Sequence, residues 1–210
     1  MIEIEGLRFQ YARNSEELFD GLSHRFEVGV VTALAGASGR GKSTLLYMLG
    51  LMLKPSAGSI WIDGEDTISL RDSERSALRA EKLGFVFQDS SLDPSRTVLD
   101  SVLEPALYAG MPRRHVVARA RDLLDHFGVG HRADRRPGQI SGGQAQRVAL
   151  CRALINNPSV ILADEPTGNL DRDNATAVMG TFRDAASTSA VIIASHDPFV
   201  LDQVDHVVSL

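Results

Sequence analysis

A glycine-rich stretch between two apolar segments constrains this chain more than any other feature. The residues from Gly36 to Ser43 read Gly-Ala-Ser-Gly-Arg-Gly-Lys-Ser. The uncharged apolar run 30–35 before them predicts a strand buried on both faces, and residues 45–53 predict a buried helix that Pro55 ends. Such a strand, turn and helix expose backbone N–H groups at a helix N-terminus, where phosphate binds well. The stretch therefore predicts a polyphosphate site, and a glycine-rich turn without a ligand is the alternative.

Four side chains can act on a polyphosphate bound there. Lys42 can reach the terminal phosphates, and Ser43 can ligate Mg²⁺. Asp164 and Glu165 follow a second buried strand, predicted at 160–163, at the strand end where open α/β sheets bind ligands. Asp164 would hold Mg²⁺ through water, and Glu165 would act as general base toward an attacking water. A helix-capping role is the alternative for Glu165.

A second anion-seeking helix start is predicted at Ser141-Gly142-Gly143-Gln144. A serine N-cap followed by two glycines presents bare amides and positive potential to an anion, before a strongly helical stretch at 145–155. A simple helix cap is the alternative. One nucleotide does not easily explain two such helix starts in one chain.

The remaining pattern predicts one α/β domain over 1–210 with a helical insertion. Strands are expected at 2–11, 24–26, 59–63, 84–87, 191–194 and 204–210, and helices between 63 and 84 and at 171–186. Residues 97–157 read as helices only, separated by Pro105, Pro112, Gly128, Pro137 and Pro158. We expect a mainly parallel sheet with helices on both faces, a core formed by 1–88 and 158–210, and a helical subdomain at 89–157.

Composition excludes several other classes. The formal net charge of −5 argues against a nucleic-acid-binding protein. The single cysteine, Cys151, excludes a disulfide framework and is expected to be a small core residue of a cytosolic protein. No segment reads as a membrane span or a secretory leader. Residues 113–136 hold seven arginines against three aspartates, either as the solvated side of two helices or as a surface facing anionic headgroups or a partner.

The stretch Ile140 to Arg147, Ile-Ser-Gly-Gly-Gln-Ala-Gln-Arg, resembles the signature of ATP-binding cassette ATPases, with Ile in place of the usual Leu. The order of the other motifs matches as well, over nearly the whole chain. The resemblance implies a P-loop NTPase fold of the RecA-like type, with antiparallel N-terminal strands and the helical subdomain inserted in the core. It also implies an ATPase that uses ATP and Mg²⁺.

The resemblance assigns roles residue by residue. Tyr11 is similar to the aromatic that stacks on adenine, Gln88 to the glutamine that senses Mg²⁺ and the membrane partner, and His196 to the switch histidine. Each residue also has a purely structural alternative. Tyr11 would be an ordinary aromatic of a strand, Gln88 would cap the end of a strand, and His196 would be a loop histidine without a specific role. The implied nucleotide-binding residues are Tyr11, Gly36, Ala37, Ser38, Gly39, Arg40, Gly41, Lys42, Ser43, Thr44, Ser141, Gly142, Gly143, Gln144 and Asp171. The implied metal-binding residues are Ser43, Gln88 and Asp164, and the implied catalytic residues are Lys42, Gln88, Glu165 and His196.

The same resemblance implies partners. Two copies would form a head-to-tail dimer around two ATP molecules and drive a separate membrane permease-like subunit, on the inner face of the cell membrane. Residues 163–171 and 84–88 are similar to the branch of macrolide exporters, lipoprotein-release machines and cell-division ATPases, some of which transmit motion without transport. The polar residues 89–91 depart from the family pattern, as do Arg40 in the phosphate loop and an end at Leu210 before the usual closing hairpin. A DNA-repair ATPase of the same type and a P-loop kinase are the competing classes.

Overall fold

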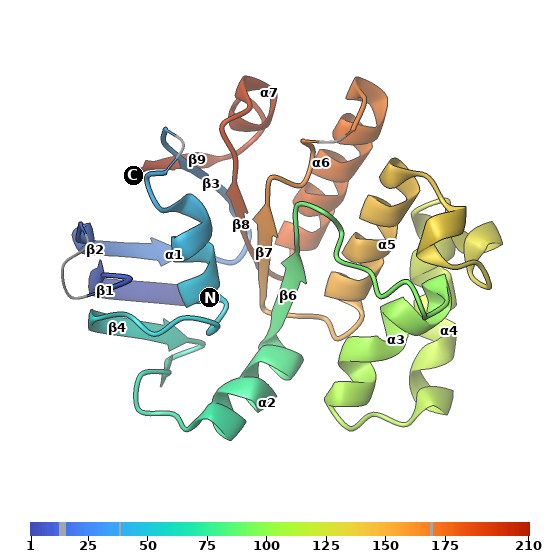
Figure 1. The fold of residues 1–210 in the computed structure, drawn as a ribbon, viewed down its shortest axis with the longest axis horizontal. Helices are drawn as coiled ribbons and strands as arrows, with labels where there is room; N and C mark the ends of the chain where they lie inside the picture. Colours follow the sequence, from blue (N-terminus) through green and yellow to red (C-terminus); the bar gives the residue numbers. More distant parts are fainter. Residues whose placement is uncertain (13–15, 38, 169) are drawn as a thin grey trace.

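A five-stranded parallel sheet forms the centre of the protein. The computed structural model describes residues 1–12, 16–37, 39–168 and 170–210 (Figure 1). The strands are β3 (Val31–Ala35), β6 (Leu83–Val86), β7 (Val160–Asp164), β8 (Ala190–Ala194) and β9 (His206–Ser209), in the spatial order β6-β7-β8-β3-β9. Every residue of β7 and β8 is buried, because helices cover both faces of the sheet. The predicted fold class is confirmed.

A second, antiparallel sheet packs beside the first. It contains β1 (Ile2–Phe9), β2 (Leu18–Phe26), β4 (Ala57–Ile62) and the short β5 (Glu65–Asp66), in the order β2-β1-β4-β5. Helix α1 (Lys42–Leu49) lies between the two sheets and shares one apolar core with both (Figure 1). The start of α1 is thereby held at the carboxyl end of β3, where the phosphate loop was predicted.

Most of the remaining helices lie on the other face of the central sheet and beyond it, whereas the helix Asp72–Lys82 packs through Leu78 into the core that contains α1 (Figure 1). They are α2 (Asp72–Lys82), α3 (Val98–Tyr108), α4 (Arg113–His126), α5 (Gly142–Leu154), α6 (Arg172–Ala186) and α7 (Pro198–Leu201), with the 3₁₀ turns η1 (Gly130–Arg132) and η2 (Pro137–Gln139). Helix α5 faces two ways: Ala149 and Leu150 pack against the central sheet, while Val148 and Cys151 pack into a separate core with α3 and α4. None of the described helices is long and apolar enough to cross a membrane.

Several predicted boundaries are wrong. Pro105 does not separate helices but lies inside α3, where the buried neighbours Leu103 and Ala106 hold the helix together despite the missing N–H. The helix after the phosphate loop ends at Leu49, before Pro55, because Gly50 ends it and Leu51 turns into the left-handed region (φ 56°).

The strand predicted at 24–26 begins at Leu18 instead, because edge strand β2 lacks a clean apolar alternation. The short elements β5 and α7 were not predicted. The core prediction for Cys151 is confirmed, since its side chain is fully buried and burial raises the pKa of its thiol. The division at residues 89 and 157 stays a prediction.

Arginines of segment 113–136 are partly used inside the fold. Arg113 pairs with Asp100 at 2.6 Å, and Arg119 donates to the carbonyl oxygens of Leu154 and Ile155 at 3.0 and 2.7 Å. Helix α4 buries only a narrow apolar stripe, so the rest of its surface is solvated. These contacts favour the solvated-helix interpretation over a headgroup-binding surface.

Candidate active site

The phosphate loop joins β3 to α1 in a conformation that needs glycine. Gly39 and Gly41 have φ angles of 85° and 91°, which side chains rarely adopt, and Gly41 is the N-cap of α1. The Lys42 ammonium donates to the carbonyl oxygens of Gly36 and Ala37 at 2.8 and 3.3 Å. This lysine therefore lies folded over the loop, where it can meet a phosphate. Ser38 lies outside the described residues.

A cavity of about 720 Å³ opens above this loop. It is lined by Tyr11, Leu18, Gly36, Ala37, Gly39, Gly41, Lys42, Ser43, Thr44, Gln88, Asp164, Glu165 and His196. The structure thus brings together, around one hollow, predicted residues from five separate segments of the chain. Arg40 does not appear among them and lines a neighbouring cavity beside β2.

Asp164 ends β7 directly opposite the start of α1. Its carboxylate accepts a hydrogen bond from the Ser43 hydroxyl at 3.1 Å and another from Tyr47. Burial raises the pKa of Asp164, and the neighbouring charge of Glu165 adds to the rise. Burial and the nearby Asp164 also raise the pKa of Tyr47. An ionised Asp164 is therefore costly in the absence of a cation, which fits an oxygen ligand for Mg²⁺.

Glu165 is held by two residues that follow β8. Its Oε1 forms a 2.6 Å hydrogen bond with Nδ1 of His196, and its Oε2 accepts one from the Ser195 hydroxyl at 3.0 Å. Its backbone is left-handed (φ 43°), a strained conformation for glutamate. The Glu165 side chain is 16% exposed and that of His196 is 76% exposed. Two hydrogen bonds therefore fix the orientation of the Glu165 carboxylate, while most of the His196 side chain remains exposed at the cavity.

Tyr11 lies just past the end of β1 at the rim of the cavity. Its hydroxyl hydrogen-bonds the Thr44 hydroxyl at 2.6 Å, and its ring packs edge-on against Phe9 with centroids 4.8 Å apart. The residue is 68% exposed, which leaves a ring face free for a flat ligand.

The signature residues lie apart from this cavity. Ser141 is the N-cap of α5: its hydroxyl accepts from the Gln144 backbone N–H at 3.3 Å, and the Gln144 side chain accepts from the Ser141 N–H at 3.1 Å. Asp171 is the N-cap of α6 and accepts two hydrogen bonds from Asn174, one from its backbone N–H and one from its side-chain amide, which lower the pKa of Asp171. Among the described residues that line the cavity, none comes from 141–144. Within one copy, Ser141 thus acts as a helix cap, and its role toward a nucleotide stays a prediction. Asn169, shortly before Asp171 in the sequence, lies outside the described residues.

Comparison with known proteins decides the family. The family model described as "ABC transporter" matches residues 19–168. The chain belongs to the ABC transporter family. It is an ATPase subunit of this family and binds ATP.

The cassette is similar to proteins of the branch expected from its sequence. The lipoprotein-releasing system ATP-binding protein LolD of Gluconobacter oxydans is 40% identical over 213 residues, which cover 100% of this chain and 92% of that protein. The macrolide export ATP-binding/permease protein MacB 1/2 of Paracoccus denitrificans is 47% identical over 183 residues, which cover 87% of this chain and 27% of that protein.

Two solved structures match the cassette with a TM-score of 0.89 and cover 100% of this chain and 94% of theirs. One, at 33% identity, is the dimeric structure of MJ0796, a bacterial ABC transporter cassette. The other, at 32% identity, is a dimeric post-hydrolysis state of MJ0796 bound to ADP and Pi.

Two residues of the cassette's site were not singled out from the sequence. Tyr47 stands four residues after Ser43, which places both on one face of α1, and this spacing could have indicated its contact with Asp164. Ser195 stands between a buried strand and His196, and it is fully buried itself. A polar residue at the end of a buried strand was the available signal for its hydrogen bond to Glu165.

Proposed function

We propose that two copies of this cassette assemble head to tail around two ATP molecules and drive a separate membrane subunit. Each nucleotide would lie between the phosphate loop of one copy and the Ser141 helix start of the other. ATP binding closes this dimer, and hydrolysis opens it. The closing and opening are the work passed to the membrane partner.

The main support for this proposal is that the chain has two helix N-termini suited to bind an anion, and that they do not share one cavity. The phosphate loop surrounds one cavity, whereas Ser141, Gly142 and Gly143 lie outside it at the start of α5. Gly142 and Gly143 leave their N–H groups uncovered by side chains of their own, at the positive end of a helix of 13 residues. In a dimer, the nucleotide bound at the phosphate loop of a second copy would meet the Ser141 helix start, which no nucleotide within the same copy would reach. The dimeric relatives of the same fold support this arrangement.

The cavity residues fit the parts of phosphoryl transfer. We assign Lys42 to the terminal phosphates, Tyr11 to the adenine ring and Glu165 to the attacking water, with His196 and Ser195 fixing the carboxylate. Mg²⁺, when bound, neutralises developing negative charge on the phosphates.

The residues present fit Mg²⁺, since Ser43 and Asp164 bring two oxygens within 3.1 Å of each other next to the phosphate loop. Gln88 lines the same cavity and is the third proposed metal contact. Magnesium typically takes few protein ligands beside substrate phosphates and water. Among the described residues no cluster of three or more His, Cys, Asp or Glu offers a cage of its own.

The dependence of ATPase rate on enzyme concentration tests the composite site. If each site needs two copies, the rate rises more steeply than linearly at low concentration and becomes linear once dimers dominate. A rate that is linear throughout would refute the dimeric site and favour a self-contained P-loop kinase or ATPase.

A groove between α2 and α3 is the proposed docking place for the membrane partner. Its volume is about 810 Å³, and it is lined in part by Met52, Phe85, Phe87 and Tyr108. Met52 and Tyr108 are exposed apolar residues, which is typical of an interaction surface. The groove reaches Phe87, the residue before Gln88, so a partner docked here contacts the loop that enters the nucleotide cavity. This docking places the cassette at the inner face of the cell membrane.

Membrane fractionation tests the groove. We expect the tagged wild-type chain to sediment with membranes of its own cells and Met52→Glu to move to the soluble fraction. Val28→Glu is the matched control, because Val28 is equally exposed (46% against 44%) but lies in the turn after β2. Equal sedimentation of both variants would exclude the groove as the docking site. Identification of the chain that copurifies with the wild type would then decide between lipoprotein release and macrolide export.

A further inference from the structure

The loop that carries Gln88 contains two strained residues shortly after it, beyond Asp89. Ser90 and Ser91 have φ angles of 55° and 46°, in the left-handed region that non-glycine residues seldom occupy. Two such residues in succession cost roughly 1–3 kcal/mol each and persist only where surrounding contacts hold them. The structure must therefore contain a group that keeps this loop in place.

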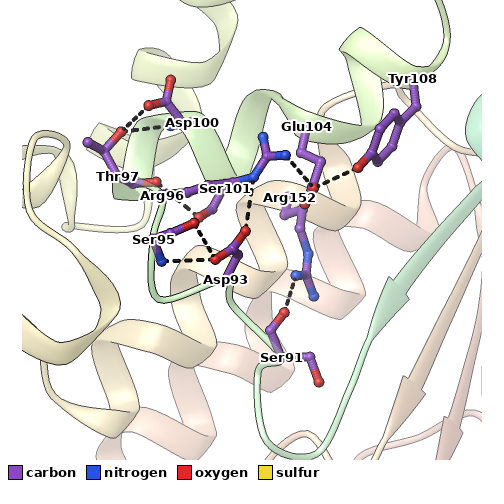
Figure 2. A network of polar contacts seen from close by, with 10 residues as sticks. All are labelled: Ser91, Asp93, Ser95, Arg96, Thr97, Asp100, Ser101, Glu104, Tyr108 and Arg152. Carbon is purple, nitrogen blue, oxygen red and sulfur yellow. Dashed lines mark hydrogen bonds and ion pairs between the residues drawn. The ribbon is translucent and has the colours of Figure 1, made fainter.

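Arg152 of α5 is that group. Its guanidinium donates one hydrogen bond to the Ser91 carbonyl oxygen at 2.8 Å and another to the Ser90 carbonyl oxygen at 2.9 Å. The planar fork of arginine suits two acceptors at once. Figure 2 shows Arg152 between α3 and the loop, with its contact to Ser91 marked.

The same helix contacts the loop on both sides of Gln88. Gln146, six residues before Arg152 on the same helix, donates to the Phe87 carbonyl oxygen at 3.4 Å. Gln88 lies between these two attachments and lines the nucleotide cavity. Helix α5 begins immediately after Ser141, so one rigid element joins the signature to the loop.

Glu104 of α3 stabilises the charge of Arg152. Burial lowers the pKa of Arg152, and the attraction of Glu104 opposes that effect. Glu104 is itself oriented by Arg96 at 3.4 Å and by the Tyr108 hydroxyl at 3.0 Å (Figure 2). Arg152, Glu104 and Tyr108 all line the groove between α2 and α3. Arg152 therefore contacts the loop from the side on which the groove lies.

We propose that Arg152 is a positioning residue for ATP hydrolysis, which fixes the loop bearing Gln88 to the signature helix through the carbonyls of Ser90 and Ser91. It touches neither nucleotide nor metal and acts through Gln88. The inference rests on the proposed role of Gln88 in the nucleotide cavity. With this attachment, a movement of α5, the helix that begins after the signature residue Ser141, would also move Gln88.

Steady-state ATPase of the purified chain, measured against ATP and against Mg²⁺, tests this. Arg152→Ala is expected to lower kcat on the order of tenfold and to raise the Mg²⁺ concentration for half-maximal rate, while the KM for ATP stays within about twofold. Arg152→Lys keeps the charge without the fork and is expected to fall between Arg152→Ala and wild type. It also carries the comparison if Arg152→Ala does not fold.

Arg119→Ala is the matched control for a merely structural effect. Arg119 also donates to two backbone carbonyls of the α5 region, Leu154 and Ile155, but among the described residues it forms no hydrogen bond with the Gln88 loop. We expect Arg119→Ala to lower Tm at least as much as Arg152→Ala and to keep kcat and the Mg²⁺ dependence within about twofold of wild type.

A double-mutant cycle with Gln88→Ala completes the test. If Arg152 acts through Gln88, the double variant is no slower than Gln88→Ala alone. Multiplicative losses, an unchanged kcat in Arg152→Ala, or equal losses in the two arginine variants would each overturn the inference. A Gln88→Ala variant with wild-type ATPase would instead refute the proposed role of Gln88, and the inference with it.

Discussion

Replacing Glu165 with glutamine separates ATP binding from ATP hydrolysis most sharply. The substitution keeps the size of the side chain and removes its charge and its basicity. The Ser195 hydroxyl can still donate to the amide oxygen, in place of its 3.0 Å contact with Oε2. The 2.6 Å contact with His196 loses its charge. Loss of one charge-assisted hydrogen bond costs about 1.5–3 kcal/mol at most, which corresponds to a Tm change of roughly 3–12 °C for a chain of this size.

The effect on turnover is expected to be much larger than the effect on stability. A positioned general base contributes typically about 10²–10⁴-fold, so kcat should fall by at least about 100-fold. ATP affinity should stay within about threefold, because Lys42, Ser43 and Tyr11 are untouched. With hydrolysis blocked, the two-copy complex should accumulate in the presence of ATP and Mg²⁺.

Three measurements on the same preparation check this. Phosphate release gives kcat, binding of a fluorescent ATP analogue gives affinity, and light scattering on a sizing column gives the fraction of dimer. Glu81→Gln is the matched control, since Glu81 lies on the exposed side of α2 and pairs only weakly with Lys82, at 3.6 Å. An unaltered rate in Glu165→Gln would remove Glu165 as the base. A lost rate without any dimer would refute the composite site.

Substitutions at three further residues test other parts of the site. Ser141→Arg should reduce hydrolysis by over about 100-fold and leave ATP affinity of the monomer within about twofold; a collapse of monomer affinity, measured by titration, would place the signature in the same site as the phosphate loop. Tyr11→Ala should weaken ATP binding by about 1–3 kcal/mol through lost stacking, and Tyr11→Phe should not, so equal affinities of the two variants would contradict stacking. Asp164→Asn should raise Tm by about 2–4 °C at pH 7 without nucleotide and abolish Mg²⁺-dependent turnover. Since the pKa of Asp164 is raised in the fold, its ionisation destabilises the protein as pH rises through that pKa, so the Tm gain should shrink toward pH 4, and a gain that is the same at both pH values would refute the cause.

The parts of the site that the sequence predicted are those encoded within a short stretch. The phosphate loop depends on glycines at φ angles of 85° and 91° and on a lysine at a fixed distance from them, so its spacing alone carries the geometry. The two carboxylates at the end of β7, Asp164 and Glu165, were predictable for the same reason. They follow a short buried apolar run, and the carboxyl end of such a parallel strand is where ligands bind.

The contacts between segments could not be predicted. The hydrogen bond from Ser195 to Glu165 joins positions 30 residues apart, and that from Ser43 to Asp164 joins positions 121 apart. Such contacts follow from the order of strands in the sheet, which the sequence pattern does not specify. The two hydrogen bonds from Arg152 to the carbonyls of Ser90 and Ser91 could not be predicted for a further reason. Serine gives no local signal for a left-handed backbone, which here depends on an arginine far away in the sequence.

The two-sided packing of α5 is the reason to expect that its attachments transmit movement and do not only stabilise the fold. Ala149 and Leu150 hold the helix to the central sheet, and Val148 and Cys151 hold it to α3 and α4. Close-packed side chains on both sides leave no room for α5 to bend, so a push at Ser141 moves the helix as a unit. The distance along the axis from Ser141 to Arg152 is about 16 Å at 1.5 Å per residue. In the proposed dimer, occupation of the signature by the nucleotide of a second copy would therefore reach the Gln88 loop through one stiff element, and docking in the proposed groove would act on the other end of that element.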